Sequence, residues 1–168
     1  MRISYTLFDT TLGTALAATT DVGLCALLFA EDDGSELEAD LARRFPDADL
    51  TRVSGTHRSL RDVVSAVKSD VHAAERQRLH LLGTPFQSSV WSELRRIPAG
   101  KTLSYTELAE KLGKPSGARA VASACAANHI AIAVPCHRVI AADGSLGGYR
   151  WGLERKQCLL ELERETGE

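Results

Sequence analysis

An apolar segment at residues 130–134 runs directly into the sequence Pro-Cys-His-Arg at 135–138, and this junction restricts the fold more than any other feature of the chain. The apolar run predicts a buried strand, which would hold the thiol of Cys136 rigidly beside a histidine base and an arginine cation. Such neighbours can convert a thiol into a nucleophilic thiolate. A cysteine in this position is also compatible with a small, buried packing residue. The other motifs of the chain distinguish these two interpretations.

The composition excludes several classes of protein. Of the 168 residues, 44% are hydrophobic and 25% are charged, which is ordinary for a globular protein. No run approaches the roughly 18 consecutive apolar residues that span a bilayer, and the N-terminus lacks the apolar core of a signal peptide. We therefore expect a cytoplasmic protein without a membrane partner.

The four cysteines are scattered along the chain without a Cys-x-x-Cys pair, and the five histidines show no ligand spacing. This pattern argues against a zinc ribbon and against a disulfide framework. We expect no bound metal. Cys125 and Cys158 lie within predicted helices, where we expect them to be packing residues.

Charge is distributed unevenly. Residues 83–158 carry ten Lys/Arg and five Asp/Glu, although the whole chain has a net charge of −2. This basic block contains the Pro-Cys-His-Arg sequence and lies between two acidic segments, 1–82 and 159–168. It is a weak indication of a polyanionic partner, and an ordinary solvated surface explains it equally well.

The N-terminal part of the chain predicts a small antiparallel sheet followed by helices. Apolar positions alternate with polar ones in residues 2–30, and turn signals divide this segment. Ser35 is followed by Glu38 at capping-box spacing, which predicts the start of a helix.

A domain boundary is predicted in the middle of the chain. Residues 46–55 are polar and predict a linker, and residues 57–69 have the apolar spacing of a second helix. The turn sequence Gly-Thr-Pro at 83–85 then separates an N-terminal α/β structural domain, 1–82, from a C-terminal domain, 83–168.

The C-terminal domain has a mostly helical pattern. Ser104 and Glu107 form a capping box, and Gly113 predicts the end of that helix. A second helix at 118–127 follows a glycine-containing turn, so the pair predicts a helix-turn-helix. Six of these ten residues are alanine, which permits close approach to another surface or to another helix in the core. A last helix at 153–165 is expected to bury Leu153, Leu159, Leu160 and Leu162. The fold class is therefore α/β (α+β).

The chemistry of the Cys-His pair needs further groups. Neighbouring residues on an extended segment point to opposite sides, so Cys136 and His137 are expected to communicate through a water. A third group has to orient the imidazole. Glu161 or Glu163 on the last helix can supply it, and spacing alone does not choose between them.

Linked motifs in the second half of the chain carry a family resemblance. They are Gly-Thr-Pro-Phe-Gln at 83–87 with Val90-Trp91, Ile-Pro-Ala-Gly at 97–100 with Ser104-Tyr105, Ala-Arg-Ala-Val at 118–121, and Pro-Cys-His-Arg-Val at 135–139. In this order they resemble O6-alkylguanine-DNA alkyltransferases of the bacterial type. The match is almost continuous over 83–163 and extends to the N-terminal part only in layout. With it, the nucleophile interpretation of Cys136 becomes the stronger one.

The resemblance implies a role for each residue around the thiol. Cys136 would accept the alkyl group from the O6 atom of guanine and keep it as a thioether. His137 would draw the thiol proton through a water, and Glu163 would complete this relay. Asn128 would shape the turn behind the cysteine.

The resemblance also implies a partner, which is double-stranded DNA containing O6-alkylguanine. The helix-turn-helix would lie in the minor groove while the target base is flipped out of the duplex. Tyr105 would hydrogen-bond N3 of the leaving guanine, and Arg119 would fill the gap in the stack. The other residues expected at the DNA or at the flipped base are Thr106, Lys114, Val139, Tyr149 and Arg150.

The implied activity is direct DNA repair by a methylated-DNA–protein-cysteine S-methyltransferase that acts once per molecule. The substrates would be O6-alkylguanine and O4-alkylthymine, no cofactor would be needed, and we expect a monomer. One alternative is a module that binds alkylated bases and signals without transfer. Another is a cysteine hydrolase using Cys136 and His137, although no oxyanion element is recognisable in the sequence.

Overall fold

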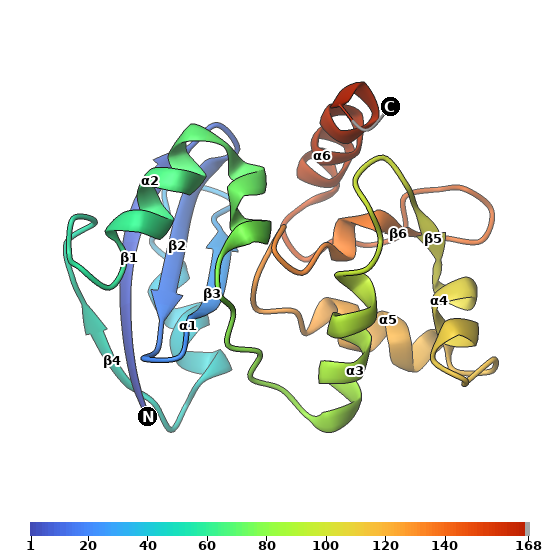
Figure 1. Cartoon of the computed structure of the whole chain (residues 1–168), viewed down its shortest axis with the longest axis horizontal. Coiled ribbons are helices and arrows are strands. Elements are labelled where there is room, and N and C mark those ends of the chain that lie inside the picture. Colours follow the sequence, from blue (N-terminus) through green and yellow to red (C-terminus); the bar gives the residue numbers. More distant parts are fainter. Residues whose placement is uncertain (167–168) are drawn as a thin grey trace. The chain divides into compact units, whose positions relative to one another are not determined.

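The computed structural model describes residues 1–166, which form two compact units (Figure 1). The first unit comprises Met1–Leu82 together with the short segment His129–Ala133. The second comprises Gly83–Asn128 and the chain from Val134 onward. The sequence prediction divided the chain once, after residue 82, and did not anticipate that residues 129–133 join the first unit.

The first unit is built on a four-stranded sheet with the strand order β3-β2-β1-β4. Its strands are β1 (Arg2–Thr10), β2 (Gly13–Thr19), β3 (Leu24–Phe29) and β4 (Asp49–Arg52). The first three pair antiparallel, as predicted, whereas β4 pairs parallel to β1. The sequence prediction of a linker at 46–55 was therefore wrong. Because β4 is a short edge strand with mostly exposed side chains, its sequence carries no apolar alternation.

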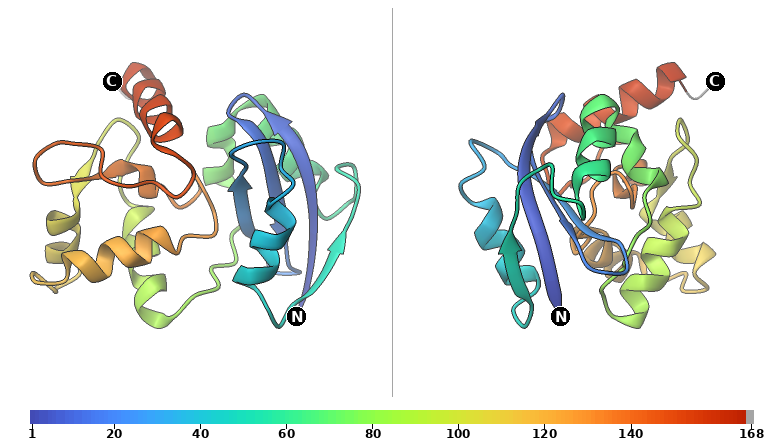
Figure 2. Two further views of the ribbon diagram at one scale, coloured as in Figure 1. Left: turned by 180° about the vertical axis from the view of Figure 1, so that it is seen from behind. Right: turned by 60° about the vertical axis from the view of Figure 1, so that its left-hand side comes forward.

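Two helices cover opposite faces of this sheet (Figure 2). Helix α1 (Leu37–Arg44) packs on β2 and β3, and helix α2 (Arg61–Ser69) packs on β1 and continues into a 3₁₀ turn, η1 (Val71–Arg76). The predicted cap at Ser35 was wrong, because Glu36 precedes α1 and no side chain caps that helix. The second helix begins at Arg61, four residues later than expected.

Residues 129–133 extend the edge of the sheet by a single bridge rather than by a strand. The amide of Leu27 donates to the carbonyl of His129, and the amide of Ala131 donates back to Leu27, both at 2.9 Å. Only Ile130 pairs with β3, and residues 131–133 turn. The predicted strand at 130–134 was therefore wrong, although its burial was predicted correctly.

The second unit is mainly helical. Its elements are α3 (Pro85–Leu94), β5 (Leu103–Ser104), α4 (Tyr105–Lys111), α5 (Ala118–Ala126), the 3₁₀ turn η2 (Cys136–Arg138), β6 (Val139–Ile140) and α6 (Leu153–Thr166). Strands β5 and β6 form a two-residue parallel pair. Helices α4 and α5 pack together across a short turn, and the indole of Trp91 on α3 donates to the carbonyl of Ala124 on α5 at 2.9 Å. No helix in residues 1–166 has the length and apolarity that a bilayer span requires.

The helix starts in this unit follow the predicted chemistry. Ser104 accepts from the amide of Glu107, whose carboxylate accepts from the amide of Ser104, so the capping box is complete. Gly113 has a φ of 73°, which a glycine adopts readily at the end of a helix.

Helix α6 buries a different face from the one predicted. Leu153 and Leu162 are 49% and 39% exposed, so their predicted burial was wrong. The face turned inward carries Lys156, Leu159 and Glu163, which are each at most 1% exposed. Two charged residues are therefore buried where the apolar pattern predicted leucines, because each finds polar partners in the interior of the unit.

Candidate active site

Two tight turns position the thiol of Cys136. Ile132 has a φ of 69°, and the amide of Ala133 reaches the carbonyl of Ala131 at 2.7 Å, which is a γ-turn. A second γ-turn, of the common inverse type, is centred on Pro135 and brings the Cys136 amide to 2.8 Å from the carbonyl of Val134. A positive φ is costly for a β-branched residue such as Ile132, on the order of 1–3 kcal/mol. The surrounding structure must therefore hold this backbone in place.

Asn128 is the residue that supports the second turn. It follows α5 and is fully buried. Its side-chain amide donates to the carbonyl of Val134 at 2.8 Å and to Sγ of Cys136 at 3.3 Å. The same side chain thus joins the turn to the sulfur.

A network of three buried side chains lies behind the cysteine. Nε2 of His137 is 2.6 Å from Oε1 of Glu163, and the exposed fractions of the two side chains are 0% and 1%. Arg138 donates to both carboxylate oxygens, from Nη2 at 2.8 Å and from Nε at 3.1 Å. A third donor of Arg138 reaches the carbonyl of Ile97 at 2.8 Å. Of the two acids left open by the sequence, Glu163 is the one in contact with His137, and Glu161 is exposed.

This network favours one tautomer of His137. A hydrogen bond between Nε2 and a carboxylate places the imidazole proton on Nε2. The other nitrogen, Nδ1, is then the one able to take up a proton. The positive guanidinium of Arg138 contacts the carboxylate of Glu163 directly. The negative charge of Glu163 is therefore compensated although it is buried.

The thiol of Cys136 is protonated at neutral pH. Burial raises its pKa to about 11, although the hydrogen bond from Asn128 and the positive charge of Lys156 both lower it. A thiol in this state reacts only when a base removes its proton.

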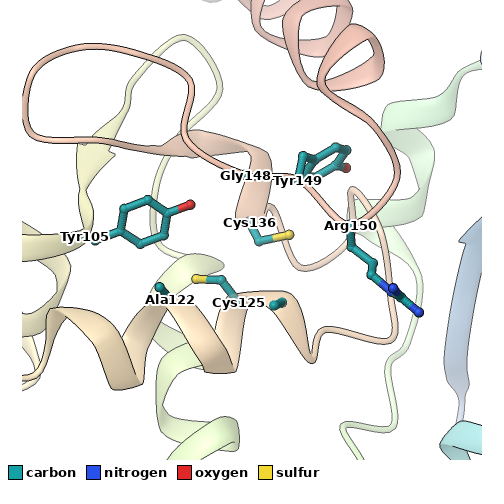
Figure 3. Close-up of a pocket in the computed structure, with 8 residues that line it drawn as sticks. Tyr105, Ala122, Cys125, Cys136, Gly148, Tyr149 and Arg150 are labelled. Carbon is teal, nitrogen blue, oxygen red and sulfur yellow. The ribbon is translucent and has the colours of Figure 1, made fainter.

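Cys136 opens onto a pocket of about 380 Å³ (Figure 3). Figure 3 shows Tyr105 on one side of the cysteine, Tyr149 and Arg150 on the other, and helix α5 as the floor. The residues lining the pocket are Tyr105, Ala122, Cys125, Ala126, Cys136, Gly148, Tyr149 and Arg150. A mostly apolar cavity of this size is suited to one small, flat ligand.

Tyr105 lies against the loop 141–152, which connects β6 to α6. Burial raises the pKa of Tyr105, negative charge on the two pocket cysteines raises it further, and a hydrogen bond from the Gly148 amide opposes this effect. Gly147, with a φ of 71°, lies so close that a Cβ would be 3.2 Å from the tyrosine ring. Glycine at 147 therefore permits close contact between the loop and Tyr105.

Some of the predicted DNA contacts lie on the exposed surface of the second unit, whereas the side chain of Val139 is fully buried. Thr106, Lys114 and Arg119 are all exposed. Lys114 lies over the ring of Phe86, with Nζ 5.7 Å from the ring centre. The exposed positions of α5 other than Arg119 carry only small side chains, at Ala120, Ser123 and Ala126.

Three residues of the site with ionisable side chains were missed by the sequence prediction. Arg138 was considered only as a cation near the thiol, although its position directly after Cys-His was a usable signal. Lys156 was overlooked, although a lysine spaced three residues from Leu159 stands on the predicted apolar face. Cys125 was expected only to pack, whereas it lines the pocket.

Three comparisons with known proteins give consistent results. A family profile described as "6-O-methylguanine DNA methyltransferase, DNA binding domain" matches residues 85–165. The bifunctional transcriptional activator/DNA repair enzyme Ada of Escherichia coli is 43% identical over the whole of this chain, which spans only 47% of that relative. The methylated-DNA–protein-cysteine methyltransferase of Candida albicans is 36% identical over 96% of this chain and 97% of its own length.

The fold is also similar to a solved structure. The crystal structure of Mycobacterium tuberculosis OGT in complex with DNA matches with a TM-score of 0.77 and 35% sequence identity. The match covers 96% of this chain and 93% of that one, so it includes both units.

Proposed function

Because the chain belongs to the family of methylated-DNA–protein-cysteine methyltransferases, we propose that it repairs DNA by transferring the alkyl group of O6-alkylguanine to Cys136. The observation that carries this proposal is the position of Cys136. Its buried thiol lines a 380 Å³ pocket, and the next residue, His137, is paired with Glu163.

The pocket requires the target base to leave the duplex. The O6 atom of a stacked guanine cannot reach a thiol that is only 5% exposed. Flipping the nucleotide into the pocket would bring O6 to the sulfur, at a cost of a few kcal/mol for unstacking. Tyr105 and Tyr149, on opposite sides of Cys136, would then form the walls around the base.

The reaction begins with removal of the thiol proton. Nδ1 of His137 takes this proton through a bridging water, and Glu163 stabilises the resulting imidazolium through Nε2. The thiolate attacks the alkyl carbon, a C–S bond forms, and the C–O bond breaks with its electron pair passing to guanine. The hydroxyl of Tyr105 hydrogen-bonds N3 of the leaving base, and one proton returns to guanine. The net change is the exchange of the thiol proton for the alkyl group.

The thioether is the final product. No group in this mechanism activates a water to cleave the C–S bond, so each molecule acts once. Cys136 is therefore consumed as a reactant.

DNA is bound through α4 and α5 of the second unit. The small exposed side chains of α5 let its backbone approach the minor groove closely. Arg119, in the first turn of α5, fills the space left by the flipped base, and Thr106 and Lys114 contact phosphates. One relative, Mycobacterium tuberculosis OGT, has been crystallised in complex with DNA, which supports this proposal.

Duplex DNA carrying O6-methylguanine with a labelled methyl group tests this proposal. We expect the label to move to the peptide that contains Cys136, at no more than one label per chain. The Cys136→Ala variant should bind the same DNA and accept no label. The matched control is Cys158→Ala, which removes a half-buried thiol of the same unit and should transfer normally.

The other interpretations predict different outcomes. Tight binding of alkylated DNA by the wild-type protein without label transfer would indicate a signalling module. Repeated turnover on an ester or amide would indicate a cysteine hydrolase.

A further inference from the structure

A buried lysine holds the loop that forms one wall of the pocket. Lys156, in the first turns of α6, has no exposed surface. Its Nζ donates to three backbone carbonyls, those of Val139 at 2.6 Å, Leu146 at 2.5 Å and Gly148 at 3.0 Å. An ammonium group has three N–H donors, and all three are used. A neutral amine has only two, so this arrangement requires the charged form.

The three carbonyls belong to one stretch of chain. Val139 lies in β6, and Leu146 and Gly148 lie in the following loop, 141–152. The first part of this loop closes on itself, since the amide of Ala141 donates to the carbonyl of Ser145 at 3.0 Å. The next part, 146–148, is the part that Lys156 binds. Four of the twelve loop residues are glycine, and such a segment loses much conformational entropy when it is ordered.

The loop carries several groups of the site. It contributes Gly148, Tyr149 and Arg150 to the pocket wall. Gly147 lies against the ring of Tyr105, while the carbonyl of the next residue, Gly148, accepts from Lys156. The short segment Gly147–Gly148 therefore lies between Lys156 and the tyrosine that we assign to the leaving base.

Lys156 also acts on the thiol through its charge. The positive charge of Lys156 lowers the pKa of Cys136, and burial lowers the pKa of Lys156 itself, whereas a negative charge on Cys136 raises it. The two groups are thus within electrostatic reach of each other in the interior of the unit.

We propose that Lys156 is a positioning residue for alkyl transfer, which fixes the pocket wall at 146–150, beside Tyr105, through three carbonyl contacts. Its ammonium additionally favours the thiolate form of Cys136. This inference rests on the proposed function, because the pocket wall matters only if a base is bound against it. The carbonyl of Val139 has two lone pairs, so it can accept from Lys156 and still accept from the guanine edge.

Two variants separate the contacts from the charge. Lys156→Met keeps a long unbranched side chain and removes both the donors and the charge. Lys156→Arg keeps the charge but places its donors in a planar fork, which does not match three converging carbonyls. Lys68→Met, an exposed lysine of the first unit, is the matched control.

The measurement is the single-turnover rate of methyl transfer from saturating duplex DNA across a range of pH. Because displacement of a reacting group by about 1 Å can cost 100-fold, we expect Lys156→Met to be slower by about 100-fold. The pH at which the transfer rate of this variant rises should also be higher than the corresponding pH for the wild type. Lys156→Arg should restore the pH profile but only part of the rate, and Lys68→Met should match the wild type. A wild-type rate and pH profile for Lys156→Met would overturn the inference.

A measurement on the wild-type fold covers the case in which Lys156→Met does not fold. The NMR resonance of the Lys156 Cε should shift over the pH range in which Cys136 ionises. This pH-dependent shift should disappear in Cys136→Ala and persist in Cys158→Ala. The protein must remain folded and able to bind DNA in this experiment. If the Lys156 resonance then does not shift as Cys136 ionises, the electrostatic part of the proposal is wrong.

The two proposals fail in different ways. If the wild-type protein accepts no label from alkylated DNA, the proposed function is wrong. If it accepts label and Lys156→Met does so equally fast, only the role of Lys156 is wrong.

Discussion

Four charged or ionisable side chains around Cys136 are removed from water, and each depends on a specific partner. His137, Arg138, Lys156 and Glu163 are at most 2% exposed. Burial of a charge is expensive unless the partner groups are in place. Removal of one partner therefore leaves another charge uncompensated, which links the stability of the second unit to the chemistry of its site.

Glu163→Gln should strongly destabilise the protein and slow alkyl transfer. The substitution removes the negative charge that Arg138 and His137 share, and loss of one partner of a buried ion pair costs about 3–5 kcal/mol. We expect a decrease of this size in the free energy of unfolding in urea. The single-turnover transfer rate should fall by at least about 100-fold, because the imidazolium is no longer stabilised.

Glu161→Gln is the control for this change. Glu161 stands two residues earlier on α6, is exposed, and contacts only Gln157 among the described hydrogen bonds. It should alter the unfolding free energy by less than about 0.5 kcal/mol and leave transfer unchanged. Equal effects at both positions would contradict the assignment of Glu163.

The stability of the protein should fall at alkaline pH partly because of Cys136. Its folded-state pKa is raised by burial from 9.0 to about 11. Below pH 9 the thiol is protonated in both states, so its contribution is complete. Between about pH 9 and pH 11 the unfolded chain ionises first and binds fewer protons, so the free energy of unfolding falls with rising pH. The shift corresponds to about 2–3 kcal/mol.

Urea unfolding at about pH 8 and about pH 10.5 tests this prediction. Cys136→Ala should lose less stability between the two conditions than the wild type, and protein methylated at Cys136 should behave like the variant. Cys158→Ala should lose as much as the wild type. An identical loss in wild type and Cys136→Ala would show that other groups cause the alkaline effect.

At the scale of single elements, helix caps place the residues of the site. Ser104 closes a capping box with Glu107, and the next residue, Tyr105, is the first residue of α4. The cap therefore fixes the backbone conformation at Tyr105 and so the direction in which its side chain points. At the start of α1, by contrast, the capping pattern of Ser35 and Glu38 is present in the sequence but is not used.

Ser104→Ala should lower the free energy of unfolding by about 0.5–2 kcal/mol, because two amides at the start of α4 lose their partners or their geometry. We also expect slower transfer, since Tyr105 is the first residue after the cap. Ser35→Ala is the matched control and should change stability by less than about 0.5 kcal/mol in the same urea experiment. A larger loss for Ser35→Ala than for Ser104→Ala would be inconsistent with the observed caps.

At the scale of the whole molecule, the basic segment of the chain coincides with the unit that carries the pocket. The acidic segment 1–82 forms most of the first unit, and the ten Lys/Arg of 83–158 all lie in the second. The weak charge signal in the sequence thus corresponds to a division between structural units. The second unit is the one that we assign to DNA.

Arg119→Ala should slow repair mainly at the step of base flipping. Unstacking a base costs a few kcal/mol, and Arg119 offsets part of it, so we expect transfer from duplex DNA to slow by about 10- to 100-fold. When the alkylated guanine lies opposite an abasic site, less pairing has to be broken and the defect should shrink. Lys68→Ala, which removes an exposed cation of the first unit, should have no effect on either substrate.

Single-turnover rates with the two duplexes measure this difference. An equal slowing by Arg119→Ala on both would assign Arg119 to general phosphate binding instead. In that case the rate at saturating DNA should recover, because only affinity would have been lost.

The sequence by itself determined the helix pair at 104–113 and 118–127, the last helix, the capping box at Ser104 and the family motifs around Cys136. These features depend on neighbours within a few residues, so local spacing is sufficient to predict them. The resemblance supplied the candidate residues, but contact between Glu163 and His137 is a property of the folded chain.

Tertiary structure alone decided the rest. Edge strand β4 forms because β1 offers unpaired backbone groups. The side chains of β4 are mostly polar, so its sequence has no alternation of apolar and polar residues that would predict a strand. Residues 130–134 turn rather than extend, because Leu27 binds one end and Asn128 the other. Helix α6 buries Lys156 and Glu163 because carbonyls of Val139, Leu146 and Gly148, together with Arg138 and His137, replace the water that these charges lose. Such compensation comes from residues distant in sequence, and hydrophobic periodicity does not contain it.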